Sequence, residues 1–335
     1  MARAGRAWVA VTATADFPVA EAPVKAALKG VAPVRTVALP FRPLSPDEET
    51  PFAEALNGAA GILLRPGYVT PSLLDRLPEL KVVAVHGAGV DQVDVEACTA
   101  RGVQVTNAPG ANADAVAELT LGLMLGLARR FPESAARVRA ERVWGEARHT
   151  GSELKGKTLG LVGLGQIGRR VAGLAGAFGM AVTAFDPGLT APEIRARGAR
   201  PLGFERLLAA ADYVSLHLPA LPSTQKLMNA RAFALMKRGA YLVNAARGPL
   251  VDEAALIRAL KRGRLAGAAL DVLAGEPPDR KSPIFEASNV ILTPHIGGST
   301  HECLETIAAT AAADISRVLR GRRPKFPVNR PARRR

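Results

Sequence analysis

The amino-acid sequence predicts an α/β protein in which parallel sheets are covered by helices on both faces. Short apolar runs alternate with helical patterns from one end of the chain to the other, and such alternation is typical of parallel sheets. A glycine-rich strand–helix–strand stretch occupies residues 158–186. The length of 335 residues is enough for two domains with separate cores. With 48% hydrophobic and 22% charged residues, the composition is globular.

The elements follow one another in a regular order. Five strands are predicted in the first third, at residues 8–15, 34–39, 61–65, 81–87 and 103–107. Helices are predicted between them, several ending on glycine, at residues 24–30, 51–58, 72–80 and 94–102. Six more strands are predicted at residues 158–163, 181–186, 213–219, 239–246, 266–273 and 289–295.

Two longer helices complete the pattern. Residues 113–130 are nearly uncharged and apolar all round, which indicates a helix buried between layers, domains or subunits. Residues 301–321 carry apolar side chains at helical spacing, so one face of this helix is expected to pack.

The net charge of +14 is concentrated at the two ends of the chain. Residues 320–335 hold eight Lys or Arg and no acid, and Arg3 and Arg6 add two more basic residues. A basic tail can attract polyanions, but a charged terminus is more often solvated and frayed. We therefore expect a solvated tail and no nucleic-acid partner.

The cysteines and the apolar segments bear on compartment. Cys98 and Cys303 are far apart and lack metal-ligand spacing, so neither a disulfide framework nor a metal site is expected. The apolar run after the first residues ends at Asp16 and predicts a strand rather than a signal peptide. Residues 115–128 are too short to span a bilayer. A cytoplasmic protein without a membrane partner is expected.

The stretch 158–186 predicts a dinucleotide site. Gly163 permits a tight turn, Gly165 lets the backbone approach a pyrophosphate, and Gly168 allows close packing of helix and strand. The N-terminus of the helix supplies N–H groups for the phosphates. Asp186, at the end of the second strand, can accept from the ribose hydroxyls and would repel a 2′-phosphate. NAD is therefore the expected cofactor.

A second set of chemically active residues follows three later strands. Arg247, then Asp271 with Glu276, then His295 each come after a strand predicted for the same sheet. The carboxyl ends of parallel strands open on one edge, which is also where a dinucleotide lies. A cation, a carboxylate and an imidazole are thus expected beside the nicotinamide.

These residue types suit oxidation of an alcohol that neighbours a carboxylate. Arg247 would bind the substrate carboxylate in a forked contact, His295 would exchange the proton, and Glu276 would orient the imidazole and favour its protonated form. The alternatives are a salt bridge of Arg247 with Asp252 or Glu253, a solvated loop acid at Glu276 and a structural role for His295.

Together these stretches resemble the D-isomer-specific 2-hydroxyacid dehydrogenases. The resemblance covers nearly the whole chain and rests on "GLGQIG", "HLPALPST", "NAARGPLVDEAAL", "ALDVLAGEPP", "PHIGGST", "HGAGVDQVD" and "NAPGANADAVAELTLGLML". It implies that Arg247, Glu276 and His295 match the family's catalytic arginine, glutamate and histidine. Members that oxidise formate carry glutamine at the position of Glu276, which argues against that branch.

The resemblance also implies an architecture. Two doubly wound parallel-sheet domains are expected, with a Rossmann NAD-binding domain inserted into a flavodoxin-like substrate domain. The substrate domain would be discontinuous, residues 1–107 plus 299–335, and the NAD-binding domain would span residues 108–298. Dimers are expected to form through the NAD-binding domain, so a homodimer is predicted.

Site residues are assigned on the same basis. The full set expected at the cofactor is Gly163, Gly165, Gln166, Ile167, Gly168, Asp186, His217, Pro219, Thr224, Asn244, Ala245, Ala246, Asp271, Gly297 and Gly298. The set expected at the substrate is Arg65, His86, Gly87, Ala88 and Gly89. The sequence "HGAGVD" matches the loop whose backbone amides hold the substrate carboxylate, which makes residues 85–90 the expected substrate wall.

Within the family the chain looks most similar to 3-phosphoglycerate dehydrogenases and hydroxypyruvate reductase-like enzymes. Arg65 matches a position where phosphoglycerate enzymes hold the phosphate, but His86 stands where they often have another arginine. The chain ends forty residues after His295, too soon for the regulatory domain of the long forms.

We expect an NAD-dependent D-2-hydroxyacid dehydrogenase that acts reversibly on a small 2-oxo acid of the hydroxypyruvate or glyoxylate type. The alternatives are a D-3-phosphoglycerate dehydrogenase and, from another class, an NAD-sensing binding protein like the family's corepressors.

Overall fold

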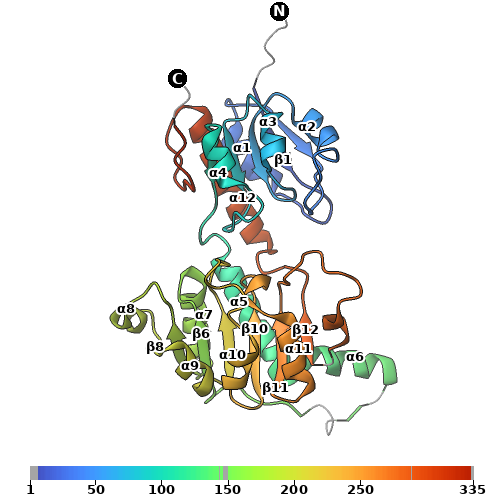
Figure 1. The fold of residues 1–335 in the computed structure, drawn as a ribbon, viewed down its shortest axis with the longest axis vertical. Coiled ribbons are helices and arrows are strands. Elements are labelled where there is room, and N and C mark those ends of the chain that lie inside the picture. The colour runs from blue at the N-terminus through green and yellow to red at the C-terminus, as the bar shows by residue number, and fades with distance from the viewer. Residues whose placement is uncertain (1–6, 143, 146–149, 288, 333–335) are drawn as a thin grey trace, which may run out of the picture. The chain divides into compact units, whose positions relative to one another are not determined.

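The computed structural model describes residues 7–142, 144–145, 150–287 and 289–332, and the chain forms two compact units. The terminal unit comprises residues 1–112 and 298–335, and the inserted unit comprises residues 113–297 (Figure 1). The divisions thus fall after Asn112 and Gly297 rather than after residues 107 and 298. Ala108 and Ala111 contact other parts of the terminal unit, because Ala108 N donates to Gly87 O and Ala111 O accepts from Cys303 Sγ.

The terminal unit contains one five-stranded parallel sheet. Its strands are β1 (Trp8–Thr12), β2 (Val34–Val37), β3 (Ala59–Leu64), β4 (Val82–Val85) and β5 (Gln104–Thr106). Its helices are α1 (Glu21–Leu28), α2 (Thr50–Leu56), α3 (Pro71–Asp75), α4 (Val95–Ala100) and α12 (His301–Leu319). The strand order β2-β1-β3-β4-β5 is that of flavodoxin-like sheets, as predicted.

Both faces of this sheet are buried because successive side chains of a strand point in opposite directions. Ile62 and Leu64 of β3 pack with α2, α3 and α4, whereas Leu63 packs with α1 and α12. The apolar face predicted for residues 301–321 is confirmed, since Ile307, Ala308 and Ile315 are buried, the last two of them in this second cluster.

The inserted unit contains a seven-stranded parallel sheet. Its strands are β6 (Thr158–Val162), β7 (Ala181–Phe185), β8 (Arg200–Pro201), β9 (Tyr213–Leu216), β10 (Ala240–Asn244), β11 (Leu265–Leu270) and β12 (Val290–Leu292). Its helices are α5 (Ala113–Arg129), α6 (Phe131–Glu141), α7 (Gln166–Ala177), α8 (Ala191–Ala196), α9 (Phe204–Ala210), α10 (Ala230–Leu235) and α11 (Glu253–Lys261), with 3₁₀ turns η1 (Gly248–Leu250) and η2 (Pro283–Glu286). The strands are arranged in the order β12-β11-β10-β9-β6-β7-β8. From β6 the chain first adds strands on one side and then crosses to the other side at β9, which is the Rossmann arrangement predicted from the sequence.

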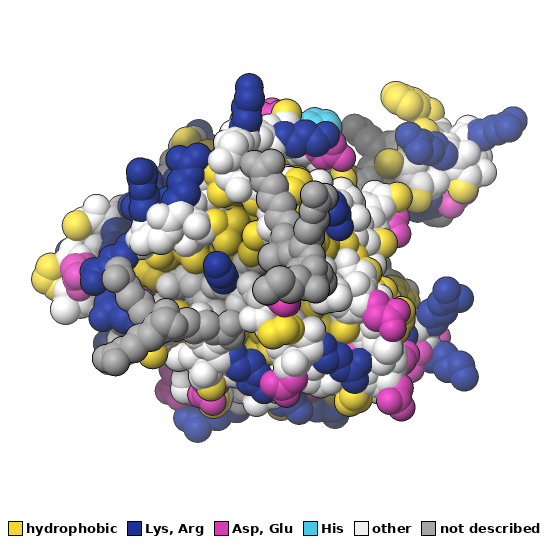
Figure 2. Space-filling view, turned by 90° about the horizontal axis from the view of Figure 1, so that it is seen from above, with side chains coloured by type: hydrophobic (Ala, Val, Ile, Leu, Met, Phe, Trp, Pro, Cys, Tyr) yellow, Lys and Arg dark blue, Asp and Glu magenta, His cyan; other side chains and the backbone are white. Residues whose placement is uncertain are grey.

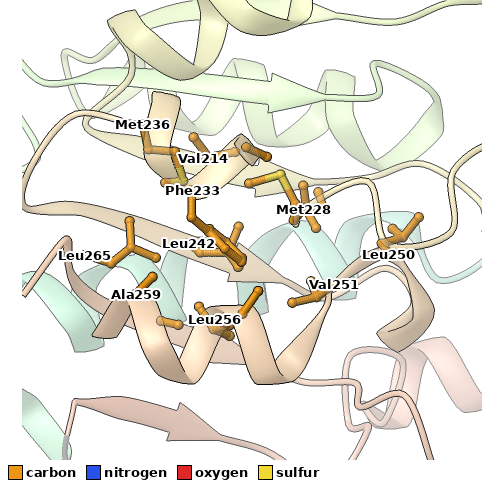
Figure 3. Packing of buried hydrophobic residues seen from close by; sticks show 14 of the residues in the cluster. Val214, Met228, Phe233, Met236, Leu242, Leu250, Val251, Leu256, Ala259 and Leu265 are labelled. Carbon is orange, nitrogen blue, oxygen red and sulfur yellow. The ribbon is translucent and has the colours of Figure 1, made fainter. Parts of the chain in front are cut away.

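The core of the inserted unit fixes the end of β10. On one face, Leu242 packs with Phe233 of α10 and Leu256 of α11 (Figure 3). Leu250 and Val251, just beyond the strand, are buried in the same cluster. The chain is therefore anchored on both sides of the segment 245–249, which contains Arg247.

The C-terminal segment corrects one expectation. The tail is not frayed at residues 324–329, here called the strap, which lie along β5, although Lys325 remains exposed as expected. The buried side chain of Asn329 accepts from Val105 N at 2.7 Å and donates to Val103 O at 2.9 Å. The buried carboxylate of Asp314 accepts from the amides of Lys325 and Phe326. These bonds satisfy the backbone at the edge of the sheet.

The basic residues Arg3, Arg6 and Arg333–Arg335 lie outside the described residues. Figure 2 shows Lys and Arg side chains on several parts of one face, with Asp and Glu side chains between them. Among the described residues, no helix is long and apolar enough to cross a membrane.

Candidate active site

The residues predicted to carry chemistry follow three adjacent strands. β10, β11 and β12 pair in parallel, so their carboxyl ends lie at one edge of the sheet. Arg247 lies three residues beyond β10, Asp271 follows β11 directly, and His295 lies three residues beyond β12. The positive charge of Arg247 is close enough to act on His295, where it opposes the rise in pKa that the hydrogen bond to Glu276 causes. The structure thus brings these three side chains to one edge.

Asp271 holds the loop that carries His295. Its buried carboxylate accepts from Thr293 Oγ1 at 2.6 Å and from the amides of Ile296 and Gly297, each at 2.8 Å. Its carbonyl accepts from His295 N at 2.9 Å. His295 adopts a left-handed backbone conformation with φ 53°, which is unfavourable for a residue with a side chain. The bonds to Asp271 offset that cost.

His295 is paired with a carboxylate. Its Nδ1 atom lies 2.6 Å from Oε2 of Glu276, while Oε1 of Glu276 accepts from Leu273 N at 3.0 Å. The imidazole is half-exposed. The hydrogen bond to Glu276, together with its negative charge, raises the pKa of His295 against the opposing effects of burial and of Arg247. Because Nδ1 is engaged, Nε2 is the ring nitrogen left to exchange a proton with a ligand.

The Arg247 loop is fixed by its neighbours. The fully buried side chain of Asn244 donates to Arg247 O at 2.9 Å and accepts from Ala246 N at 3.1 Å. A Cβ atom on Gly248 would stand 1.9 Å from the carbonyl of Leu273, so only glycine permits this approach. The loop of Arg247 therefore lies directly against the loop that leads to Glu276.

The carboxylates considered as alternative partners of Arg247 have structural roles. Asp252 caps α11 by accepting from Ala255 N at 2.9 Å. Glu253 accepts from Ala274 N at 2.6 Å and so ties α11 to the segment before Glu276.

The glycine loop after β6 needs two of its glycines for its own packing. Gly163 has φ 101°, and a Cβ there would stand 2.7 Å from the backbone of His217. A Cβ on Gly168 would stand 2.3 Å from Gly163 O, so the helix lies against the strand only because this residue is glycine. Both positions are explained by contacts within the protein.

Gly165 is different. Its φ is −72° and a Cβ there would meet nothing within 4 Å, so neither strain nor packing requires glycine. It is the N-cap of α7, the helix that begins at Gln166 and Ile167, and it leaves the first amides without a side-chain cap. Open space beside uncapped helix N–H groups fits the phosphates of a dinucleotide.

Asp186 lies beside this loop. Its two oxygens accept from Leu164 N at 2.7 Å and from Gly188 N at 2.9 Å. A carboxylate has further lone pairs, so it can still accept from ribose hydroxyls. Sequence reasoning missed Arg197, at the end of α8, which donates to Leu164 O at 2.7 Å. The sequence did offer a signal for this contact, since a basic residue follows the first helix after Asp186.

The segment after β9 forms a wall next to the glycine loop. Burial lowers the pKa of His217 to about 4, so its imidazole is neutral. Its Nε2 lies 2.9 Å from Ser215 Oγ, and its buried Nδ1 has no protein partner within the described chain. Thr224 closes the following turn by donating to Pro219 O at 2.8 Å. Pro219 in this segment is exposed, and Ala245 and Ala246, which follow β10, are buried.

The predicted substrate residues belong to the terminal unit. Arg65 follows β3, residues 86–89 follow β4, and Arg65 Nη1 lies 3.1 Å from Nδ1 of the buried His86. Burial, and then the charge of Arg65, lower the pKa of His86 to about 3. This imidazole is therefore neutral, and Arg65 is the cation of the pair.

The predicted set is thus divided between two units. Arg247, Glu276, His295 and the cofactor residues up to Gly297 are in the inserted unit, whereas Gly298 and the substrate residues are in the terminal unit. Within the described parts of the chain, no cluster of three or more His, Cys, Asp or Glu is arranged to hold a metal ion.

Comparison with known proteins identifies the family. Residues 121–297 match the NAD binding domain of the D-isomer specific 2-hydroxyacid dehydrogenases. The chain belongs to this family. The matched segment is its NAD-binding domain and coincides with most of the inserted unit, so the predicted cofactor, NAD, is that of the family.

Individual relatives agree with this assignment. D-3-phosphoglycerate dehydrogenase of Methanocaldococcus jannaschii is 41% identical over 280 residues, 83% of this chain and 53% of that protein. The chain therefore spans about half the length of the curated relatives it matches. A solved protein from Thermus thermophilus is 38% identical with a TM-score of 0.84, covering 96% of this chain and 99% of its own. A glyoxylate reductase from Paecilomyes thermophila is 29% identical with a TM-score of 0.82, covering 96% and 98%.

Proposed function

We propose that this protein is an NAD-dependent D-2-hydroxyacid dehydrogenase that interconverts a small 2-oxo acid and its 2-hydroxy acid. The observation that supports this most directly is the His295–Glu276 pair, with the charge of Arg247 close by, at the strand edge of an NAD-binding domain. This combination provides a proton donor and a carboxylate-binding cation where hydride chemistry takes place.

The protein's part in the reaction follows from these side chains. Bound NADH supplies the hydride. His295, protonated and held by Glu276, donates its Nε2 proton to the carbonyl oxygen as reduction proceeds, and it takes the proton back in the reverse direction. Arg247 binds the substrate carboxylate and orients the neighbouring carbonyl. Asp271 keeps His295 in place without taking part in proton transfer.

The charge on the substrate side favours an unphosphorylated acid. Of the loops that follow β3 and β4, residues 65–70 and 86–91 contribute one cation, Arg65, because His86 is neutral. Arg42, in the loop after β2, is bound to Glu48 at 2.7 Å. A phosphate dianion would thus meet one cation, Arg65, from these two described loops, whereas hydroxypyruvate or glyoxylate needs none beyond the carboxylate site. The identity to phosphoglycerate dehydrogenases keeps 3-phosphoglycerate as the second candidate.

A panel of 2-oxo acids, followed by NADH absorbance, tests the proposal. We expect reduction of hydroxypyruvate or glyoxylate. In the Arg65→Ala variant, KM for a phosphorylated 2-oxo acid should rise more than KM for an unphosphorylated one if phosphate is bound there. Equal changes for both substrates would exclude the phosphate site. Absence of turnover across the panel, with NADH still bound, would favour an NAD-sensing binding protein.

We further propose a homodimer formed through the inserted unit. Among its described residues α6 buries none, and it extends away from the sheet of that unit (Figure 1). Phe131 on this helix is 52% exposed, and Trp144 beyond it is 94% exposed. Exposed aromatic side chains on a projecting helix and just beyond it suit contact with a second copy. Light scattering should give a dimer that Trp144→Glu dissociates, and a monomeric wild type would contradict this proposal.

A further inference from the structure

Asn107, directly after β5, contacts the loop that follows β4. Its Nδ2 atom donates to Ala88 O at 2.6 Å. The amide of the next residue, Ala108, donates to Gly87 O at 2.8 Å. Two successive carbonyls of the glycine loop are therefore held by two successive residues of the neighbouring strand end.

Because peptide bonds are planar, the hydrogen bonds to these two carbonyls also fix the directions of the amide N–H groups that follow them. In a planar trans peptide the C=O and N–H bonds point in opposite directions. Fixing Gly87 O and Ala88 O toward residues 107–108 therefore turns the amides of Ala88 and Gly89 away from them. In the described part of the chain, the amides of Ala88 and Gly89 donate no hydrogen bond to a backbone carbonyl of a turn or loop. A Cβ on Gly87 would meet nothing within 4 Å, so there is open space beside the loop.

We propose that Asn107 is a positioning residue that aims the amides of Ala88 and Gly89 at the carboxylate of the substrate. The inference rests on the proposed function, since it concerns how that 2-oxo acid is bound. Asn107 acts through the loop and does not touch the reacting atoms. Two successive N–H groups in a glycine-rich turn can form a site for one anion, and the direction of each depends on the carbonyl of the same peptide.

The position of Asn107 is itself fixed. The preceding strand β5 lies between β4 and the strap, whose Val328 N donates to Val105 O at 2.9 Å. Thr106 forms an antiparallel bridge with Pro327. The side chain of Asn107 therefore extends from a strand end that is held on both sides.

Two substitutions test the role. Asn107→Ala removes the donor to Ala88 O, and Asn107→Asp places an oxygen against that carbonyl while keeping the size of the side chain. Both variants should weaken the hydrogen bonds from the loop amides to the charged carboxylate. KM for the 2-oxo acid should therefore rise roughly 10- to 100-fold, with KM for NADH unchanged. Affinity for oxalate, measured by calorimetry, should fall by a similar factor.

Gln104→Ala is the matched control. Gln104 lies on the same strand, and its Nε2 donates to Asn329 Oδ1 on the strap at 2.8 Å rather than to the glycine loop. This variant loses an amide side chain of similar burial and should retain the wild-type KM. Thermal unfolding establishes that all three variants are folded.

The outcomes separate this inference from the proposed function. Wild-type KM and oxalate affinity in both Asn107 variants, or an equal rise of KM in Gln104→Ala, would overturn it, as would a parallel loss of NADH affinity. If the wild type reduces no 2-oxo acid, the proposed function fails, yet oxalate titration still decides the role of Asn107. A wild type that does not bind oxalate overturns the inference as well.

Discussion

The Nδ1 atom of His295 lies 2.6 Å from the Oε2 atom of Glu276, and this contact sets the proton affinity of the imidazole. The hydrogen bond is the largest cause of the raised pKa of His295, and the charge of the carboxylate acts in the same direction. A protonated imidazole is the form that reduction of a 2-oxo acid consumes. For the proposed reduction, the pair thus extends the pH range in which a proton donor is available.

Glu276→Gln should move the pH profile of reduction to lower pH. His295 must be protonated at the start, so the rate falls as pH rises through its pKa. Removing the negative charge lowers that pKa, and the descending limb should shift downward accordingly. The measurement is kcat/KM for the 2-oxo acid across pH in both proteins.

Asp279→Asn serves as the control for this shift. Asp279 lies three residues from Glu276 in the same loop and accepts from Lys281 N at 2.9 Å. The Asp279→Asn variant loses the same negative charge as Glu276→Gln, but at a side chain that is not bonded to the imidazole. A shift of equal size in this variant would mean that general electrostatics, rather than the His295–Glu276 bond, controls the profile.

His295→Gln should abolish turnover and leave NADH binding intact. Glutamine keeps polar atoms of similar reach but cannot act as an acid or base at neutral pH, so a loss of at least roughly 100-fold in kcat is expected. NADH affinity, measured by fluorescence titration, should remain that of the wild type. A simultaneous loss of both would show that His295 is structural.

Features that depend on local patterns were predictable from the sequence. The five strands of the terminal unit follow the predicted apolar runs, and α5 matches the predicted helix at 113–130 within one residue. Gly30, Gly58 and Gly102 end helices with positive φ, as glycine-terminated helices predict. Alternation of element types was enough to indicate parallel sheets because parallel strands need a crossover between them, whereas the division into two sheet domains was implied by the family resemblance.

Features that depend on partners distant in sequence were not predictable. The carboxylate of Asp271 meets amides 25 and 26 residues later, and Asn329 bonds to Val105 from 224 residues away. The two-residue β8 and the projecting α6 were also missed, since the first is too short for a periodic signal and the second buries nothing. The frayed tail was predicted from its charge alone, and charge does not reveal that Asn329 bonds to Val105 and Val103.

The glycine loop offers a test of which glycines serve the ligand. Gly165→Ala should fold with wild-type stability, because a Cβ there meets open space, yet its affinity for NADH should fall at least roughly 10-fold if that space is where the pyrophosphate binds. Gly168→Ala should instead destabilise the fold, because its Cβ would stand 2.3 Å from Gly163 O. Urea unfolding and NADH titration of both variants measure these effects. Wild-type NADH affinity in Gly165→Ala would contradict the assignment.

Asp271→Asn should destabilise the inserted unit and slow turnover while sparing NADH binding. An amide in place of the carboxylate cannot accept from all of Thr293 Oγ1, Ile296 N and Gly297 N, so at least one buried donor loses its partner. The expected cost is about 2 kcal/mol in the free energy of unfolding, measured by urea titration. Because the same bonds hold His295, kcat should fall as well. Thr293→Val removes one of the three donors and leaves both amides bound, so it should show a smaller loss of stability and a smaller loss of kcat. Weakened NADH binding with unchanged stability would instead mean that Asp271 contacts the cofactor, the role suggested by the family resemblance.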